Sequence, residues 1–575
     1  MIFEARNILL ERLRQDETPP SSIRFKNITL HEPAKADLLP YLDAEASGTP
    51  ISLRPFVPRC VEIIWSTANE RIVHESIISL DANAEVSRTG PKKGQHGSID
   101  RYEAKSAAEK IVNHPEVREA VEALGLAEDV TIACDPWMYG ADRGNDEETH
   151  KFIQGYLYAL APGKGPASNQ YSYPLPFSPV YDVFTGELAR IEPMATGGRE
   201  DGLELNTAGT LPMAHCIPTE YHADILDGPQ RTDLKPLHVT QPEGPSFNYR
   251  EGMTIHNVRY DGRSLFYRLS ISEMTVPYGD PRTPYHRQQA MDLGDAGAGS
   301  CANNLRLGCD CLGTIKYFSG WLNDDNGMPV PAKNVICMHE QDGGIGWKHT
   351  HRLTHHGSVV RARNLVLQSI ITVGNYEYIF AWVFMQNGNV DLGVRATGIL
   401  STSLIDEGKT SDWGNVVSPG TLAANHQHLF SMRDDPMIDG SQNTVVQEDS
   451  VPIPQTEDED PHGNAWRVVK TPLETSGFSD AHPFANRCFK ILNEHIFNPV
   501  SGNPVGYKLV PQPCQLLLAG KDSIVRKKAK FAEHHIWVTK YRDGDLWAAG
   551  KWTNQSLEEF DGLADYAGRA DGVRT

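Results

Sequence analysis

Three groups of histidines have the residue types and spacing of candidate metal ligands. One is His426-Gln-His428; since side chains two positions apart on a strand point to the same face, these two imidazoles could chelate one ion. The other groups are His349, His351, His355 and His356, and the pair His534-His535. Imidazole ligands favour copper, zinc or iron over magnesium or calcium. Because the chain has 22 histidines, chance adjacency of ordinary surface or core histidines is the alternative for each group.

The composition restricts the class of protein that carries these groups. The chain has 575 residues and a formal charge of −20, and its apolar (39%) and charged (22%) fractions are those of a globular protein. The acidic balance argues against a nucleic-acid partner and against docking on anionic membranes. No segment approaches the roughly 20 apolar residues that span a bilayer. No secretory signal opens the chain, so we expect an intracellular location, cytoplasmic or peroxisomal.

The spacing of apolar residues predicts three regions that would position these side chains. Residues 1–95 contain one helical pattern followed by strand-like runs, which predicts a small α+β domain. Residues 100–200 have a similar plan, with a helical stretch that Pro115 divides in two. From 225 to 575, short β-branched and aromatic runs alternate with Gly, Asn, Asp and Pro. This pattern predicts a large antiparallel β-sandwich, so the fold class is mixed α+β and mainly β.

The segment Thr372-Val-Gly-Asn-Tyr-Glu-Tyr378 is similar to the cofactor motif Asn-Tyr-Asp/Glu-Tyr of copper-containing amine oxidases. Other segments resemble the same family in the family's order: Val276-Pro-Tyr278-Gly-Asp280-Pro, Met291-Asp292-Leu-Gly, Leu307–Gly313, Ile336–Glu340, Val394–Leu400, His426-Gln-His428 and His535–Thr539. The resemblance covers essentially the whole chain. It implies a homodimeric oxidoreductase whose β-sandwich holds the active site, and which converts a primary amine, O2 and water to an aldehyde, ammonia and hydrogen peroxide.

The resemblance also implies roles for four residues of the active site. Tyr376 matches the residue that copper(II) and O2 convert to topaquinone, which supplies the carbonyl for a Schiff base with the amine. Asp292 matches the general base that then removes the α-proton, and burial should raise its pKa toward neutrality. Tyr278 matches a residue that hydrogen-bonds a quinone oxygen, and Asn375 one that restrains the cofactor. Without the resemblance, each would be an ordinary strand or turn residue.

Four further residues are expected around that site. Cys311 and Cys337 match a disulfide that would brace the segment carrying Asp292; two buried thiols are the alternative in a reducing compartment. Trp137 is expected either to line the substrate channel or to pack in a core. Ala290 stands where relatives can hold a bulkier gating aromatic residue. A small residue there suggests an open channel that accepts aryl-alkyl amines, although the sequence does not indicate which amine is used.

The sequence departs from the family pattern at both metal sites. His426 and His428 match two copper ligands, but the third histidine of the family would follow Thr575, and a site with two imidazoles should hold copper more weakly. Asp435 matches one ligand of a peripheral calcium or manganese site, whose second acidic stretch would also follow Thr575. The chain is therefore expected to be either a fragment of the enzyme or catalytically compromised.

Two other interpretations remain at this point. A non-catalytic β-sandwich homodimer would keep the fold but fail to mature its cofactor. A zinc hydrolase would use the histidines between His349 and His355, and it is the less favoured of the two.

Overall fold

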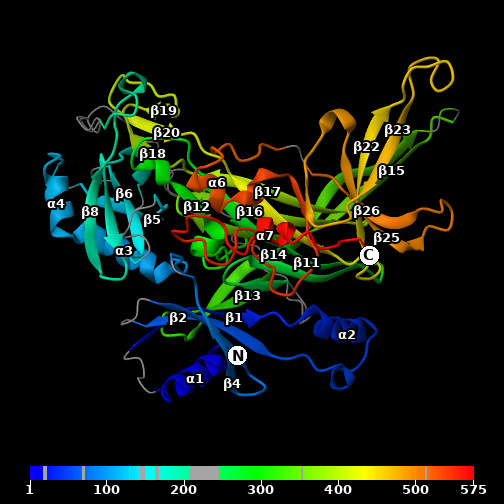
Figure 1. Cartoon of the computed structure of the whole chain (residues 1–575), viewed down its shortest axis with the longest axis horizontal. Coiled ribbons are helices and arrows are strands. Elements are labelled where there is room, and N and C mark those ends of the chain that lie inside the picture. The colour runs from blue at the N-terminus through cyan, green and yellow to red at the C-terminus, as the bar shows by residue number, and fades with distance from the viewer. Residues whose placement is uncertain are drawn as a thin grey trace.

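The computed structural model describes residues 1–574 apart from 17–21, 68–71, 93, 128–129, 143–148, 162–167, 206–244, 351, 353 and 512–513. The chain forms two small α+β parts, each with a four-stranded antiparallel sheet, followed by a large part built of antiparallel sheets (Figure 1). The predicted fold class is therefore confirmed. The domain borders near 95–100 and 200–225 stay predictions, and the second border lies largely outside the described residues.

The first part combines one amphipathic helix with consecutive strands. Helix α1 (Ile2–Leu13) packs on a sheet with the order β1 (Ile23–His31), β2 (Cys60–Thr67), β3 (Val73–Ser79) and β4 (Ala84–Thr89). Apolar residues recur every three or four positions in this helix, so Leu9 and Leu13 share a core with Ile63 and Ile78 of the sheet. Between β1 and β2 lie α2 (Lys35–Ala46) and the 3₁₀ turn η1 (Ile51–Leu53).

The second part has a similar plan with two helices. Helices α3 (Arg101–Asn113) and α4 (Pro115–Glu122) accompany a sheet with the order β5 (Ile132–Met138), β6 (Phe152–Ala159), β7 (Phe177–Asp182) and β8 (Glu187–Pro193). A residue before proline avoids the helical conformation, so His114 is extended and divides the two helices, as predicted at Pro115. The 3₁₀ turns η3 (Gln170–Ser172) and η4 (Arg199–Asp201) complete this part.

Two five-stranded antiparallel sheets form the centre of the large part. One sheet contains β9 (Ser246–Asn248), β10 (Gly252–Tyr260), β11 (Arg263–Pro277), β12 (Gln289–Met291) and β21 (Leu429–Pro436). The other has the order β13 (Ile315–Asn323), β14 (Pro329–Thr350), β15 (Gly357–Val373), β16 (Tyr376–Met385) and β17 (Val390–Gly398). Leu269 of the first sheet lies in one core with Ile336 and Trp382 of the second. The predicted sandwich core is thus made by residues of both sheets.

Smaller elements surround these two sheets. Three more sheets contain β18 (Thr402–Leu404), β19 (Gly414–Ser418) and β20 (Thr421–Ala424); β22 (Thr444–Pro452), β23 (Trp466–Pro472), β25 (Cys488–Phe497) and β26 (Pro504–Leu509); and β24 (Gly477–Ser479) with β27 (Ile536–Val538). The short helical elements are η6 (Tyr285–Arg287), η7 (Asp292–Ala296), η8 (Pro483–Ala485), α6 (Ile524–Lys528), η9 (Lys530–Glu533) and α7 (Leu563–Gly568). None of the helices described here combines the length and apolar character that a bilayer crossing requires.

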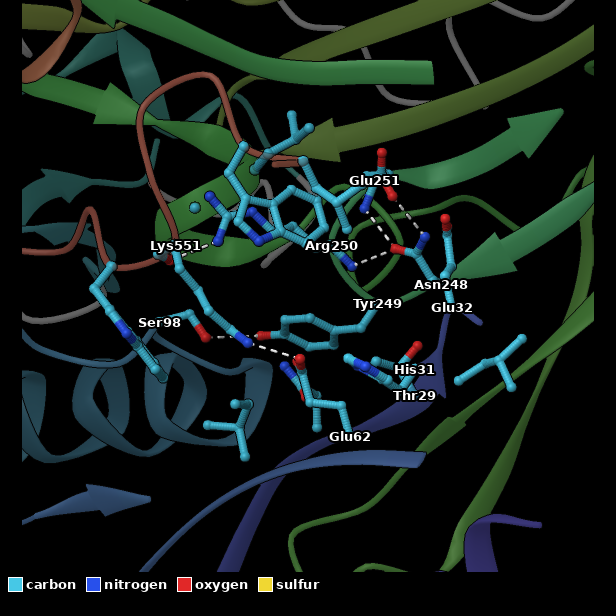
Figure 2. A pocket seen from close by; sticks show the side chains of 18 residues that line it. Thr29, His31, Glu32, Glu62, Ser98, Asn248, Tyr249, Arg250, Glu251 and Lys551 are labelled. Atoms are coloured by element: carbon cyan, nitrogen blue, oxygen red, sulfur yellow. Dashed lines mark hydrogen bonds and ion pairs between the residues drawn. The ribbon is translucent and has the colours of Figure 1, made fainter. Parts of the chain in front are cut away.

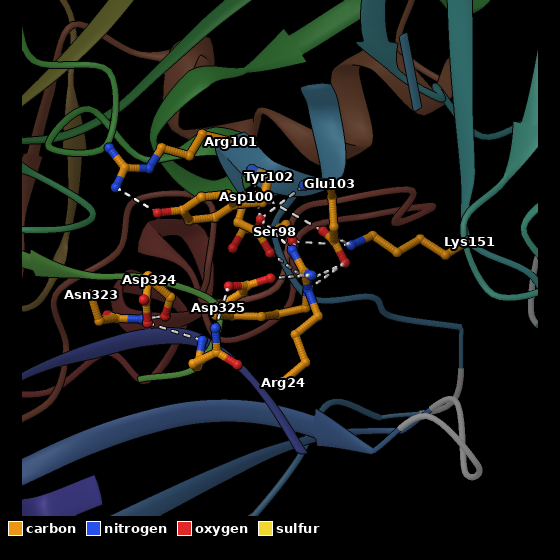
Figure 3. A network of polar contacts seen from close by, with 12 residues as sticks. Arg24, Ser98, Asp100, Arg101, Tyr102, Glu103, Lys151, Asn323, Asp324 and Asp325 are labelled. Carbon is orange, nitrogen blue, oxygen red and sulfur yellow. Dashed lines mark hydrogen bonds and ion pairs between the residues drawn. The ribbon is translucent and has the colours of Figure 1, made fainter. Parts of the chain in front are cut away.

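A network of buried and half-buried charges joins the three parts (Figure 3). Arg24 of β1 donates to Asp100 at the start of α3 (2.7 Å) and reaches Asp325 of the large part (3.5 Å). Lys26 and Lys151 both contact the carboxylate of Glu103, at 2.7 and 2.9 Å. Although burial opposes the charged form, these lysines hold the pKa of Glu103 well below its ordinary value. The network fixes the α+β parts against the β-sandwich that carries the site.

Candidate active site

Tyr376 lies beside the tight turn of the hairpin formed by β15 and β16 of the second sheet. It is the first residue of β16 and pairs with Val373, the last residue of β15. The two-residue turn between them begins with Gly374 at φ +58°, a conformation that favours glycine. Asn375, the second turn residue, donates its side-chain Nδ2 to the carbonyl oxygen of Ile399 at 2.6 Å. The turn and this hydrogen bond fix the backbone position from which the buried side chain of Tyr376 extends.

Both imidazoles of the His-x-His motif meet tyrosines of this strand. The Tyr376 hydroxyl lies 2.7 Å from His426 Nε2, and the Tyr378 hydroxyl lies 2.9 Å from His428 Nδ1. The His426 and His428 ring centroids are 4.9 Å apart. The pair lies just before β21, and His426 forms an isolated antiparallel bridge with Tyr278. The motif is thus placed by extended backbone at a strand's edge, close to the predicted strand position.

The two imidazoles fit a copper site in their chemistry. Nδ1 of His426 lies 2.8 Å from the carbonyl oxygen of Ala424, which only accepts, so Nδ1 carries the proton and Nε2 keeps its lone pair. Burial, with a smaller effect of His426, lowers the pKa of His428 to about 4, so this ring is neutral, as a ligand must be. Among the described residues, no group of three or more His, Cys, Asp or Glu has the arrangement of a metal site. Copper therefore has two candidate ligands in this part of the chain.

The other predicted histidine groups lack this arrangement. The described residues of the first group, which include His349 and His355, do not form a three-ligand cluster, and His351 lies outside the described residues. His534 and His535 both contact the carboxylate of Asp480 at 3.0 Å, whereas the Tyr376 hydroxyl contacts His426. No three-ligand zinc site is therefore present among the described residues.

An aromatic wall closes the site on the side of the second α+β part. The Tyr278 ring stacks on His426, with centroids 5.0 Å apart and an interplanar angle of 18°. The edge of Trp137, from β5, meets the Tyr278 ring at a centroid distance of 5.6 Å. Both rings share one buried cluster with Ala290 of β12. Trp137 therefore packs in a core that contains Tyr278, and a role in lining the substrate channel stays a prediction.

Asp292 begins a π-helical turn, η7, directly after β12. Only 2% of the residue is exposed, and no hydrogen-bond donor reaches its Oδ1 atom among the described residues. Burial raises the pKa of its carboxyl group well above the ordinary value, and the charges of Asp295 and Glu273 raise it further. Burial raises the pKa of the Tyr378 hydroxyl, and the charge of Asp292 raises it further. A carboxylate with so few compensating partners binds a proton strongly.

Comparison with known proteins decides what this arrangement belongs to. The family described as "Copper amine oxidase, enzyme domain" matches residues 245–575. Copper amine oxidase 1 of Aspergillus niger is 45% identical to the chain, over 99% of the chain and 87% of that protein. The chain belongs to the copper amine oxidase family. It is therefore an enzyme, an oxidoreductase that acts on primary amines with copper and O2, and the non-enzymatic interpretation is not favoured.

Two further relatives agree with this assignment. The peroxisomal primary amine oxidase of Pichia angusta is 34% identical over 95% of this chain and 80% of its own length. The crystal structure of a copper-containing benzylamine oxidase from Hansenula polymorpha superposes with a TM-score of 0.88 at 38% identity, over 99% of this chain and 90% of that one. Enzymes of this family use copper and a topaquinone.

The sequence alone did not reveal three buried charged residues near Asp292. They are Glu273, Asp295 and Lys528. Glu273 lies in a run, 265–274, that the sequence indicates only as a strand. Its signal was a single acidic residue among β-branched and apolar neighbours, at a position where burial requires a partner.

The enzyme's two matched cysteines lie together as thiols. The Sγ atoms of Cys311 and Cys337 are 3.3 Å apart, whereas a disulfide bond is about 2.05 Å long. Both cysteines are free and buried in the structure, Cys337 on β14 and Cys311 before β13. The bridge is thus not formed here, and the disulfide stays a prediction.

The residues around Asp435 do not fit a second metal site. Nζ of Lys35 lies 2.7 Å from Oδ1 of Asp435. The same ammonium group lies over the rings of Tyr267 and Tyr541, at 4.4 and 4.3 Å from their centroids. A calcium or manganese ion would have to displace this ammonium group, and no three-ligand cluster exists here among the described residues. The expected metal at Asp435 is replaced in this structure by a lysine side chain.

Proposed function

We propose that the enzyme oxidises primary amines at Tyr376, which matures to topaquinone, with His426 and His428 as copper ligands and Asp292 as the general base. The observation that carries this proposal is the 2.7 Å contact between the Tyr376 hydroxyl and His426 Nε2, at the start of the strand that bears the family motif. When formed, the quinone would supply the carbonyl with which a primary amine condenses, and copper would supply the redox chemistry with O2.

The imidazoles and Asn375 orient Tyr376 in this proposal. The Tyr376 hydroxyl donates a hydrogen bond to Nε2 of His426, because Nδ1 of the same ring carries the proton and points to the Ala424 carbonyl; this Nε2 lone pair would hold copper in place of the hydrogen bond. Asn375 holds the start of β16 against the Ile399 carbonyl, so the tyrosine ring cannot swing away with the turn. The buried surroundings raise the pKa of Tyr376, so the hydroxyl stays protonated until a metal binds nearby.

Asp292 is suited to take a proton from the α-carbon of a bound amine. Its buried carboxylate is not stabilised by a cation or by a donor to Oδ1 within the described residues, so protonation relieves an unfavourable charge. Positioned general bases contribute typically about 10²–10⁴-fold to the rate. The apolar residues Leu293 and Met274, which share a buried cluster with Tyr376 and Tyr378, keep water from the same region.

The substrate class that we propose is an amine with an aryl group. The wall formed by Trp137, Tyr278 and the small side chain of Ala290 offers aromatic surface beside the site. The relative of known structure from Hansenula polymorpha is named a benzylamine oxidase. Rates with methylamine, benzylamine and phenylethylamine test this proposal; a preference for methylamine alone would contradict it.

We further propose that the enzyme is a homodimer. The outer halves of β14 and β15 and the β22–β23 hairpin project beyond the sandwich (Figure 1). They expose large apolar side chains, including Trp347 (54% exposed) and Trp466 (69% exposed), which a partner surface would cover. Light scattering should give twice the chain mass, and Trp347→Glu with Trp466→Glu should shift the protein toward a monomer. A monomeric parent enzyme would rule the dimer out.

Three further proposals concern the location of the enzyme, its cysteine pair and Asp435. Relatives from Pichia angusta and Nicotiana tabacum are named peroxisomal, which supports a peroxisomal location for this enzyme. The proximity of Cys311 and Cys337 supports a disulfide when the protein meets an oxidant. We propose no calcium or manganese ion at Asp435, since Lys35 neutralises its carboxylate.

The test of the proposed function is cofactor formation. The protein incubated with Cu²⁺ and O2 should develop a visible quinone absorption that phenylhydrazine titrates. Tyr376→Phe should lack both, because phenylalanine has no hydroxyl group to direct oxidation of the ring. Tyr378→Phe is the matched control, since it removes the neighbouring hydroxyl from the same strand. A Tyr376→Phe protein that still reacts with phenylhydrazine would show that the quinone forms elsewhere.

A further inference from the structure

Two acidic side chains lie directly behind Asp292, and both have 0% of their surface exposed: Glu273 of β11 and Asp295 of η7. Glu273 Oε1 accepts the backbone N–H groups of Leu293 (3.0 Å) and Gly294 (3.2 Å), the two residues after Asp292. Asp295 Oδ2 accepts the N–H of Met291 (3.0 Å), the residue before it. The backbone on both sides of Asp292 is thus held by two buried carboxylates.

Arg250 prevents Glu273 from moving. Its Nη2 atom lies 3.2 Å from Glu273 Oε2 and donates to the Gly550 carbonyl at 2.8 Å, while Nη1 donates to the Lys551 carbonyl at 2.5 Å. The guanidinium also lies 4.5 Å from the ring centroid of Trp547. Figure 2 shows Arg250 in the wall of a pocket between the first α+β part and the sandwich, near Lys551 and Glu251. Glu273 is therefore anchored through Oε2, while its Oε1 atom holds the turn after Asp292.

The turn itself is packed without spare room. A Cβ atom at Gly294 would lie 2.3 Å from Thr553 Oγ1 and 3.0 Å from Arg250 Nη2, so only glycine fits there. The Thr553 hydroxyl donates to Asp295 Oδ1 at 2.6 Å. Small displacements of Glu273 would therefore pass to Asp292 through the backbone rather than be absorbed by a cavity.

The charges around Asp292 do not balance. Within the described part of the chain, three buried carboxylates, Asp292, Asp295 and Glu273, share two cations, Arg250 and Lys528, and neither cation is among the charges that act on Asp292. Arg250 and backbone donors serve Glu273, and Lys528 with the Thr553 hydroxyl serves Asp295. Among the described residues, the charge of Asp292 also acts on Cys301 and Tyr378, whose pKa values burial raises, so both groups are neutral at pH 7. A negative charge is therefore least stabilised at Asp292, so Asp292 is the carboxylate of this cluster that binds a proton first.

We propose that Glu273 is a positioning residue for amine oxidation: it accepts the N–H groups of Leu293 and Gly294, so it holds the turn that carries Asp292, and together with Asp295 it places negative charge near Asp292. The inference rests on the proposed role of Asp292 and adds a residue of β11, the strand that pairs with β12 just before Asp292. Removal of one negative neighbour stabilises the Asp292 anion, so its pKa falls and the acidic limb of the rate profile moves to lower pH.

Glu273→Gln tests this inference, because glutamine has nearly the same shape and its Oε1 atom still accepts N–H groups. With benzylamine as substrate, the acidic limb of kcat/KM should move to lower pH. The plateau kcat should fall by roughly 3- to 10-fold as the base weakens, while KM stays within about twofold. Infrared difference spectra against Asp292→Asn should show that the carbonyl stretch of protonated Asp292 titrates at lower pH in Glu273→Gln than in the parent protein, without reference to turnover.

Glu251→Gln is the matched control. Glu251 is also buried and paired with an arginine, since its carboxylate contacts Arg268 at 2.6 Å, yet it is not among the charges that act on Asp292. This variant should be less stable than the parent enzyme, but the acidic limb of its kcat/KM profile should stay at the parent pH. A shift of equal size in Glu251→Gln would mean that the limb reports general loosening, and the inference would fail.

The possible failures are distinguishable. If Asp292→Asn turns over amines at the parent rate, the proposed base is wrong. If Asp292→Asn is inactive but Glu273→Gln leaves both the acidic limb and the infrared titration unchanged, only the role of Glu273 is wrong. If Glu273→Gln does not fold, Asp295→Asn tests the same charge effect, and an unmoved limb in that variant overturns the proposal.

Discussion

The hydroxyl group of Tyr376 lies 2.7 Å from Nε2 of His426, although the two residues are 50 positions apart. Tyr376 is the first residue of β16 after its turn, and His426 lies just before β21, where it forms a β-bridge with Tyr278. These two backbone positions bring the side chains together. The contact places the tyrosine proposed to become the cofactor on the nitrogen atom proposed to hold copper.

Asp292 and the histidines should fail at different steps. Asp292→Asn should keep copper and phenylhydrazine reactivity while turnover falls by about 10²-fold or more, because only the base is lost. His428→Ala should instead lose copper and, with it, the quinone. Copper per chain by mass spectrometry and absorbance after phenylhydrazine distinguish these results. His349→Ala, from a histidine group without a three-ligand cluster, is the control and should keep both.

Trp137→Leu should discriminate between substrates. The variant removes an aromatic edge that contacts Tyr278 beside the site, a contact worth about 0.5–1.5 kcal/mol beyond its buried area. The kcat/KM for benzylamine should therefore fall by roughly 10-fold, while that for methylamine changes little. Trp321→Leu, at a side chain of β13 that is 60% exposed, should alter neither rate. Equal losses for both amines would mean that Trp137 serves only the packing of the second α+β part.

Lys35→Met should destabilise the enzyme and create a response to divalent cations. The substitution keeps the length of the side chain but leaves the buried Asp435 carboxylate without its ammonium partner, at a cost of about 3 kcal/mol. Calcium or manganese should then raise the Tm of the variant and leave that of the parent protein unchanged. Lys105→Met, at a side chain that is 77% exposed, should have little effect. A parent protein that gains stability from these ions would show that Lys35 does not replace a metal.

Glu559→Gln should stabilise the enzyme at alkaline pH. Burial raises the pKa of Glu559 to about 8, compared with about 4.3 in an unfolded chain. Between these values the folded state holds the extra proton, so stability falls as pH rises from about 4.3 to 8. Glutamine has no charge to bury, so the gain should reach roughly 1–3 kcal/mol above pH 8 and vanish near pH 4.

Urea unfolding at several pH values measures this gain. Glu558→Gln is the control, because Glu558 is the neighbouring glutamate and is exposed. A pH-independent gain in Glu559→Gln would show that the buried charge is not its source.

The sequence by itself determined the local parts of the site. The order of family segments predicts Tyr376 and Asp292 as site residues, and the two-residue spacing of His426 and His428 lets both imidazoles contact tyrosines of one strand. The turn at Gly374 follows from the same short-range chemistry, since only residues a few positions apart are involved. Alternating apolar residues likewise predicted the α+β parts and the sandwich, because a strand or helix with one apolar face must bury it.

Only the tertiary structure decided which distant charges meet. Lys35 and Asp435 are 400 positions apart, so no periodic pattern could predict that an ammonium group would fill the expected metal site. Glu273 looked like one residue of a strand, and its partners Asp295, Arg250 and Lys528 come from a turn, a loop and a short helix. The energy of a buried charge depends on which counter-charges lie within a few ångströms, and that distance is set by how sheets and loops pack, not by the order of residues along the chain.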